Sequence, residues 1–177
     1  MKTKLAAILT TFTLASFAAT ARAGCCDPKC PTMMRTANAD QNAALMEPVK
    51  SVFDDYLKIQ SALAKDSIDG VAANASAISK AVRGDSMNML SPEVASHADI
   101  LANAKDLAAA REAFKSLSKS LIQYLNANNV THAYVEVYCP MAKANWLQKD
   151  DKIDNPYLGA SMRSCGQIQK KTNQKTS

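Results

Sequence analysis

The sequence has few of the residues on which most enzymes depend. Only two histidines occur among its 177 residues, and they lie far apart. There is no glycine-rich phosphate-binding loop, no serine nucleophile motif and no pair of histidines at metal-binding spacing. There is also no Cys-x-x-Cys motif, which at the start of a helix would lower a thiol pKa for redox catalysis. These absences argue against an enzyme.

Long apolar runs are scarce as well. The one apolar run, Leu5 to Ala18, follows Lys2 and Lys4 and precedes an Ala-x-Ala cleavage site at residues 21–23. This pattern predicts a cleaved secretory signal peptide over residues 1–23. A run of about 14 residues is too short to span a membrane, and no later stretch is apolar enough. We therefore expect a periplasmic protein with no transmembrane segment once the signal is removed.

A lipoprotein is the alternative to a simple cleaved signal. An acylated cysteine often follows a small residue, and Cys25 follows Gly24. Arg22, however, occupies a position where a lipoprotein signal prefers a leucine-like residue. The sequence therefore favours the periplasmic protein without a lipid anchor.

A strong net charge is absent from the mature chain. The formal net charge of the whole sequence is +5, and the segment 1–23 contributes Lys2, Lys4 and Arg22 and no acid. Removing these three positive charges leaves +2, with lysines scattered among acidic residues. So small a charge is poor support for nucleic-acid binding, and we expect none.

The mature chain has the length of one domain, and its hydrophobic pattern is mainly helical. Apolar residues recur at helical spacing in four segments, which begin near Asn42, Ser67, Ser91 and Leu107. Ser67 can cap the second helix, and Ser91 reads as the cap of the third, with Pro92 at its first position. The fourth helix is expected to run from near Leu107 to Ala127.

The β-branched and aromatic stretch 131–138 reads as a strand, but a lone strand cannot make a sheet. Trp146 is expected in the loop that follows it. We therefore predict an all-α fold, with an extended segment on the surface of a bundle of about four helices.

This reading divides the chain into four parts. The signal peptide at 1–23 precedes a flexible Cys/Met-rich lead-in at 24–40. The helical bundle domain occupies 41–169 and ends in the Cys/Met motifs, and a polar tail follows at 170–177. A short helix from Gly159 to Ile168 is expected to carry the second of those motifs.

Sulfur-bearing residues are the most informative feature that is present. Cys139 and Met141 alternate in the extended segment, so they share a face. Met162 and Cys165 are three residues apart and share a face on a helix or a helical turn. If the two segments meet, four soft sulfur ligands converge, and such ligands select Cu(I) or its relative Ag(I).

A disulfide between Cys139 and Cys165 is the alternative for the same residues. Oxidising compartments favour disulfides, and methionines near one often only fill the core. The five cysteines are an odd number for an exported chain, so at least one is unpaired, lipidated, bound to metal or paired between molecules. A second cluster is either a metal-capturing arm or a tail with a disulfide; it consists of Cys25, Cys26, Cys30, Met33 and Met34.

The residues after Val137 also form a spaced motif. It consists of Tyr138-Cys139-Pro140-Met141, Trp146, Asn155-Pro156-Tyr157, Gly159, Met162 and Cys165-Gly166. This motif resembles a bacterial periplasmic domain of unknown function, which occurs alone and fused to CusB-type adaptors of copper and silver efflux pumps. The resemblance covers roughly Met46 to Ile168. It implies a helical, periplasmic, metal-associated role, but it does not extend to the N-terminal cysteine cluster.

Two functions follow as expectations. The first is a periplasmic Cu(I)- or Ag(I)-binding protein, acting as a chaperone, a buffer or an accessory to metal efflux. Its partner would be a copper or silver efflux adaptor or another periplasmic metal carrier. The alternative is a disulfide-pinned helical interaction domain of the cell envelope, with no metal role.

Overall fold

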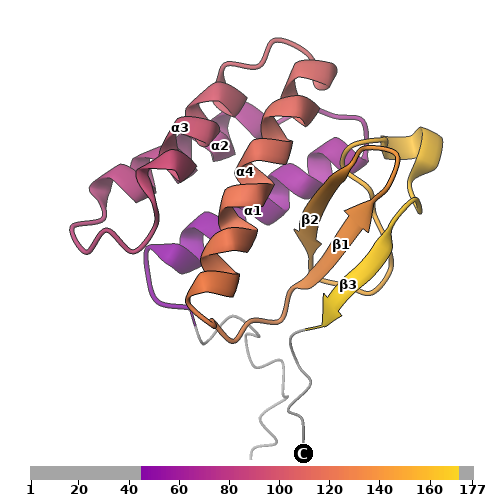
Figure 1. The fold of residues 1–177 in the computed structure, drawn as a ribbon. Coiled ribbons are helices and arrows are strands. Elements are labelled where there is room, and N and C mark those ends of the chain that lie inside the picture. Colours follow the sequence, from indigo (N-terminus) through magenta and orange to yellow (C-terminus); the bar gives the residue numbers. More distant parts are fainter. Residues whose placement is uncertain (1–44, 172–177) are drawn as a thin grey trace, which may run out of the picture. The chain divides into compact units, whose positions relative to one another are not determined.

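The computed structural model describes residues 45–171, which form four helices followed by a small sheet (Figure 1). The helices are α1 (Val49–Ala64), α2 (Val71–Gly84), α3 (Pro92–Ala102) and α4 (Leu107–Ala127). The strands are β1 (Val135–Cys139), β2 (Ala144–Gln148) and β3 (Gln167–Lys171), with a 3-10 helix, η1 (Gly159–Met162), before β3. The fold is therefore mixed α/β, and the all-α prediction was wrong. No helix within residues 45–171 is long and apolar enough to span a membrane.

Local capping explains where the last two helices begin. The Ser91 side chain accepts a hydrogen bond from the amide of Glu93 at 3.2 Å, and Pro92 occupies the first turn of α3. The Asp106 side chain accepts from the amide of Ala109 at 2.8 Å and starts α4. Each of these helices therefore begins directly after a residue whose side chain accepts a hydrogen bond from one of the free amides of the first turn.

The first two helices begin differently from what the sequence suggested. α1 starts after Pro48, which is the residue before the first helical turn. α2 starts after Gly70, whose φ of +74° suits glycine. The expected cap of α2, Ser67, lies in the preceding turn, where its hydroxyl accepts from the amide of Asp69 at 3.0 Å. Ser67 therefore shapes the loop and does not cap the helix.

The three strands form one antiparallel sheet with the order β2-β1-β3. β2 is an edge strand and packs against α4 and α1. The amide of Leu147 in β2 donates to the hydroxyl of Tyr56 in α1 at 3.0 Å, and that hydroxyl also hydrogen-bonds Ser118 of α4 at 2.9 Å. Tyr56 is fully buried, so its hydroxyl gives the buried amide of Leu147 a hydrogen-bond partner and joins β2 to α1 and α4. This support allows three short strands to form a stable sheet.

The observed sheet differs from the prediction in two respects. The expected strand at 131–138 overlaps β1, but β1 is the central strand of the sheet and not an isolated surface segment. Trp146 lies in β2, not in the loop in which the sequence placed it. It is fully buried, and its ring meets that of Tyr157 edge-on with 5.8 Å between the centroids.

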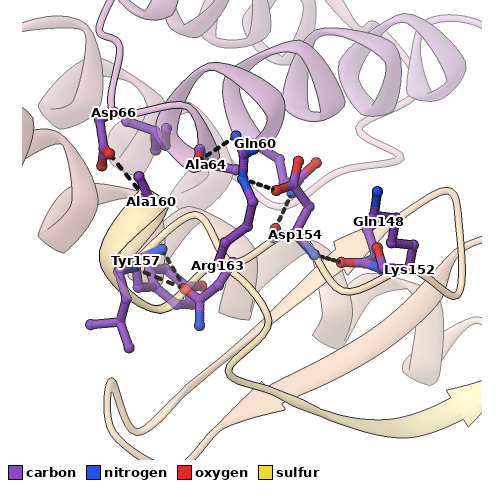
Figure 2. Close-up of polar contacts among 12 residues, drawn as sticks. Gln60, Ala64, Asp66, Gln148, Lys152, Asp154, Tyr157, Ala160 and Arg163 are labelled. Atoms are coloured by element: carbon purple, nitrogen blue, oxygen red, sulfur yellow. Dashed lines mark hydrogen bonds and ion pairs between the residues drawn. The ribbon is translucent and has the colours of Figure 1, made fainter.

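The loop between β2 and β3 is fastened to the end of α1 by two arginines. Arg163 donates to the carbonyl of Ala64 at 3.1 Å and forms an ion pair with Asp154 at 2.8 Å (Figure 2). Arg111, from α4, donates to the carbonyls of Leu63 at 3.0 Å and Pro156 at 2.9 Å. The last carbonyls of a helix have no partner within it, so both guanidinium groups cap α1 and hold the loop.

A carboxylate and an amide complete this attachment. Asp66 pairs with Arg111 and accepts a hydrogen bond from the amide of Ala160 at 3.0 Å, which ties η1 to the end of α1 (Figure 2). The pKa of Asp66 is lowered, chiefly by the Arg111 guanidinium and then by the Ala160 amide. Gln60 donates to the carbonyl of Asp154 at 2.7 Å. Together these contacts fix the segment that ends at Cys165.

Candidate functional site

The two C-terminal cysteines lie side by side. Cys139 is the last residue of β1 and is fully buried, whereas Cys165 lies between η1 and β3 and is half-buried. Their sulfur atoms are 3.4 Å apart. A disulfide bond is about 2.05 Å long, so both residues are free thiols in contact.

Strand pairing brings these cysteines together. β3 runs antiparallel to β1, with Tyr138 opposite Gln167 and Val137 opposite Ile168. The residues just before β3 therefore arrive at the end of β1, where Cys139 lies. A Cβ atom at Gly166 would lie 2.7 Å from a methyl group of Val137 and within 3 Å of the Trp146 ring. Only glycine allows so close an approach between the two chain segments.

The turn from β1 to β2 supplies hydrogen-bond donors to the buried sulfur. The amide of Ala142 donates to the Cys139 sulfur at 3.3 Å, and the amide of Met141 and the side chain of Asn155 also hydrogen-bond it. The turn is tight, and its last residue, Lys143, has a φ of +51°. The Cys139 sulfur is therefore buried but surrounded by N–H groups.

These surroundings shift the two thiol pKa values in opposite directions. Burial raises the pKa of Cys139, but the donors from Ala142, Asn155, Cys165 and Met141 together outweigh burial, and the net pKa is lowered. The pKa of Cys165 is raised, first because its S–H donates to Cys139 and then by burial and by the Cys139 charge. When one proton leaves the pair, the negative charge therefore resides on Cys139 and the remaining proton on Cys165.

Asn155 organises the loop beside the thiols and is fully buried. Its side-chain oxygen accepts from the amides of Tyr157 at 2.8 Å and Leu158 at 3.0 Å. Its side-chain nitrogen donates to the carbonyl of Cys165 at 2.5 Å. In the sequence, Asn155 stands out only as part of the spaced motif. An asparagine directly before proline was the only local sign that its side chain would bond the backbone.

The methionine side chains of the two motifs are more exposed than the thiols. Met141 is 66% exposed and Met162 is 45% exposed, so neither fills the core. The predicted helix from Gly159 to Ile168 is only the short η1, and it ends at Met162. Beyond the end of η1, one further turn joins Met162 to Cys165, because the amide of Cys165 donates to the carbonyl of Met162 at 3.0 Å. The structure brings the two thiols together and leaves both thioethers at the surface.

The donor set restricts which metals fit this place. Within residues 45–171, no three side chains of His, Cys, Asp or Glu gather closely enough to hold a metal ion. A structural zinc site uses four such ligands, so the described part of the chain holds none. Two adjoining thiols instead suit a soft monovalent ion that accepts few ligands. Three predictions lie outside the described residues: the signal peptide predicted at 1–23, the lead-in predicted at 24–40, and the predicted ligands Cys25, Cys26, Cys30, Met33 and Met34.

Comparison with known proteins assigns a domain but no activity. No curated protein and no solved structure shows a significant match to the chain. Residues 52–133 match a family model described as a protein of unknown function, DUF3347. The match begins within α1, includes the other three helices and stops before β1, so Cys139 and Cys165 lie outside it. Over residues 52–133, which include most of the helical part, the chain is therefore similar to the DUF3347 family.

Proposed function

We propose that the protein binds Cu(I) or Ag(I) through Cys139 and Cys165 and acts in the periplasm as a metal chaperone, a buffer or an accessory to efflux. The observation that carries the proposal is the distance of 3.4 Å between the two sulfurs, one of them half-buried. Thiolates are soft ligands, and soft ligands select monovalent copper and silver over the hard cations. A small outward movement of Cys165 opens a position between the sulfurs for an ion.

The groups around the thiols support this role. Metal ligands are commonly oriented by hydrogen bonds from neighbouring groups. Here the Ala142 amide fixes the sulfur of Cys139 at 3.3 Å, and the Asn155 side chain fixes the backbone of Cys165 at 2.5 Å. The arginine contacts at the end of α1 make the loop rigid. The protein thus holds both ligands near their working positions before the metal arrives.

The exposed methionines suit delivery of the metal to another protein. Met141 is two residues from Cys139 and Met162 is three residues from Cys165, and both side chains are exposed. We propose that these flexible side chains reach an ion held by the cysteines. A weak thioether ligand exchanges readily, which favours transfer over storage. A copper or silver efflux adaptor, or another periplasmic metal carrier, is the partner that the spaced C-terminal motif favours.

A competition titration tests the proposal. Reduced protein, with Cys25, Cys26 and Cys30 changed to serine, is titrated anaerobically with Cu(I) against a coloured chelator. We expect one tightly bound ion, and a loss of affinity of about 100-fold or more in Cys139→Ser or Cys165→Ser, equivalent to roughly 2.7 kcal/mol. Met87→Leu is the matched control, because Met87 is 77% exposed on a distant loop. Equal binding by the serine variants and the parent protein contradicts the proposal.

The second candidate is the disulfide-pinned interaction domain of the cell envelope. The same sulfur distance favours it, because thiols in contact need only a short approach to form a bond. Mass spectrometry of protein taken from its own compartment separates the two functions. A complete Cys139–Cys165 bridge that resists mild reductant supports the second candidate. A readily reduced pair with metal retained supports the first.

A further inference from the structure

The two thiols differ in how easily a reagent from solvent reaches them. Cys139 is fully buried under the turn at 140–143 and beside the Asn155 side chain. Cys165 is half-buried and lies outside any helix or strand, in the connection from η1 to β3. A molecule approaching from outside therefore meets Cys165 first, with Cys139 directly behind it at 3.4 Å.

From this arrangement we propose that Cys165 is a site of reversible thiolation by low-molecular-weight disulfides and that Cys139 is the thiol that resolves the adduct. The pair then acts as a redox control on the same site. A sulfur in a disulfide is no longer a thiolate ligand, so oxidation prevents metal binding. This regulatory consequence rests on the proposed function, whereas the thiol chemistry does not need the metal.

The chemistry balances in two exchanges. In the first, Cys165 passes its proton to the adjoining Cys139 thiolate, and the Cys165 sulfur then attacks one sulfur of the reagent RSSR, whose S–S bond breaks. One RS⁻ leaves and takes the proton from Cys139, and Cys165 carries the SR group. In the second, the Cys139 thiolate attacks the Cys165 sulfur, the mixed disulfide breaks and another RS⁻ leaves. The protein dithiol loses two hydrogens and becomes a disulfide, while RSSR is reduced to two RSH.

The geometry favours the second exchange. The sulfurs must approach by only about 1.4 Å to reach the disulfide bond length of about 2.05 Å. Cys165 has no strand pairing of its own, because β3 begins at Gln167. Its carbonyl and amide are held by Asn155 and Met162, but rotation of its side chain is not restricted by a β-ladder. The resolving step is thus expected to be faster than the first attack.

The test uses reduced, metal-free, full-length protein with Cys25, Cys26 and Cys30 changed to serine, and oxidised glutathione as the probe. Intact-mass and peptide mass spectrometry follow the products. We expect the parent protein to form the Cys139–Cys165 disulfide without retaining glutathione. We expect Cys139→Ser to accumulate one glutathione on Cys165, and Cys165→Ser to react at least tenfold more slowly. Glutathione held on Cys139, or no adduct on Cys165 in a folded Cys139→Ser protein, overturns the proposal.

A measurement without either substitution keeps the test decisive if Cys139→Ser fails to fold. The parent protein is treated with limiting iodoacetamide, and the alkylated peptides are counted over time. Alkylation of Cys165 well before Cys139 supports the assigned order, and equal or reversed rates refute it. Because no metal is present, a protein that binds no Cu(I) can still pass both tests. The proposed function and the thiolation site therefore fail independently.

Discussion

Replacing Gly166 with alanine is expected to lower the free energy of unfolding by about 2–3 kcal/mol. The new methyl group would lie 2.7 Å from a side-chain carbon of Val137 and 2.8 Å from the ring of Trp146. Both neighbours are fully buried in a close-packed region, so neither has room to move. Relief requires the segment carrying Cys165 to shift away from β1, which also separates the two thiols. Urea unfolding measures the first effect, and the rate of disulfide formation by the pair measures the second.

Gly84→Ala is the control for this substitution. Gly84 is the last residue of α2, and a Cβ atom there would meet nothing within 4 Å. Alanine is about 1 kcal/mol better than glycine within a helix, so this variant should be as stable as the parent protein or slightly more stable. If Gly166→Ala were equally well tolerated, the segment before β3 would not pack closely against β1. The short distance between the sulfurs of Cys139 and Cys165 would then be unexplained.

Replacing Asn155 with alanine is expected to destabilise the protein by about 3 kcal/mol, because buried polar groups lose their partners. The amides of Tyr157 and Leu158 would lose their acceptor, and the carbonyl of Cys165 would lose its donor. The buried Cys139 sulfur would also lose a hydrogen bond. We therefore expect weaker Cu(I) binding together with the loss of stability, both measurable on the same purified variant.

Asn145→Ala provides the comparison within the same part of the fold. Asn145 is half-buried in β2 and donates one side-chain hydrogen bond, to Glu136 at 2.7 Å. A single bond of this kind contributes about 1 kcal/mol, so the change in stability should be much smaller. Similar losses for the two alanine variants would show that Asn155 does not have the organising role described for it.

Sequence patterns predicted the helices well because their signals are local. Ser91-Pro92-Glu93 marks the start of α3, and the structure confirms the serine cap and the proline in the first turn. The predicted limits of the fourth helix, Leu107 and Ala127, are the limits of α4. A capping residue and an apolar stripe are both read within a few turns of one segment, so no knowledge of distant contacts is needed.

The sheet escaped prediction because β2 and β3, unlike β1, do not carry a complete alternating pattern. β2 contains three consecutive buried residues, Trp146 to Gln148, since one face meets the helices and the other meets the loop that follows. β3 reads Gln-Ile-Gln-Lys-Lys and resembles a polar tail. Their strand conformation comes from pairing with β1, and pairing is a tertiary property that short windows of sequence do not reveal.

The candidate site was predictable in part for the same reason. The spacing of cysteine and methionine pointed to Cys139 and Cys165, and antiparallel pairing of β1 with β3 brings their sulfurs into contact. Convergence of all four sulfurs stays a prediction, because the Met141 and Met162 side chains are exposed at the surface. The surrounding donors, Ala142 and Asn155, come from the folded turn and loop, which only the three-dimensional arrangement defines.

X-ray absorption at the copper edge tests the central claim most directly. Reduced protein is loaded with one equivalent of Cu(I), with Cys25, Cys26 and Cys30 changed to serine so that only the C-terminal thiols remain. We predict a first coordination shell made only of sulfur, containing two or three atoms, and loss of that shell in Cys139→Ser/Cys165→Ser. A first shell of nitrogen and oxygen, or a sulfur shell that survives the double substitution, would contradict it.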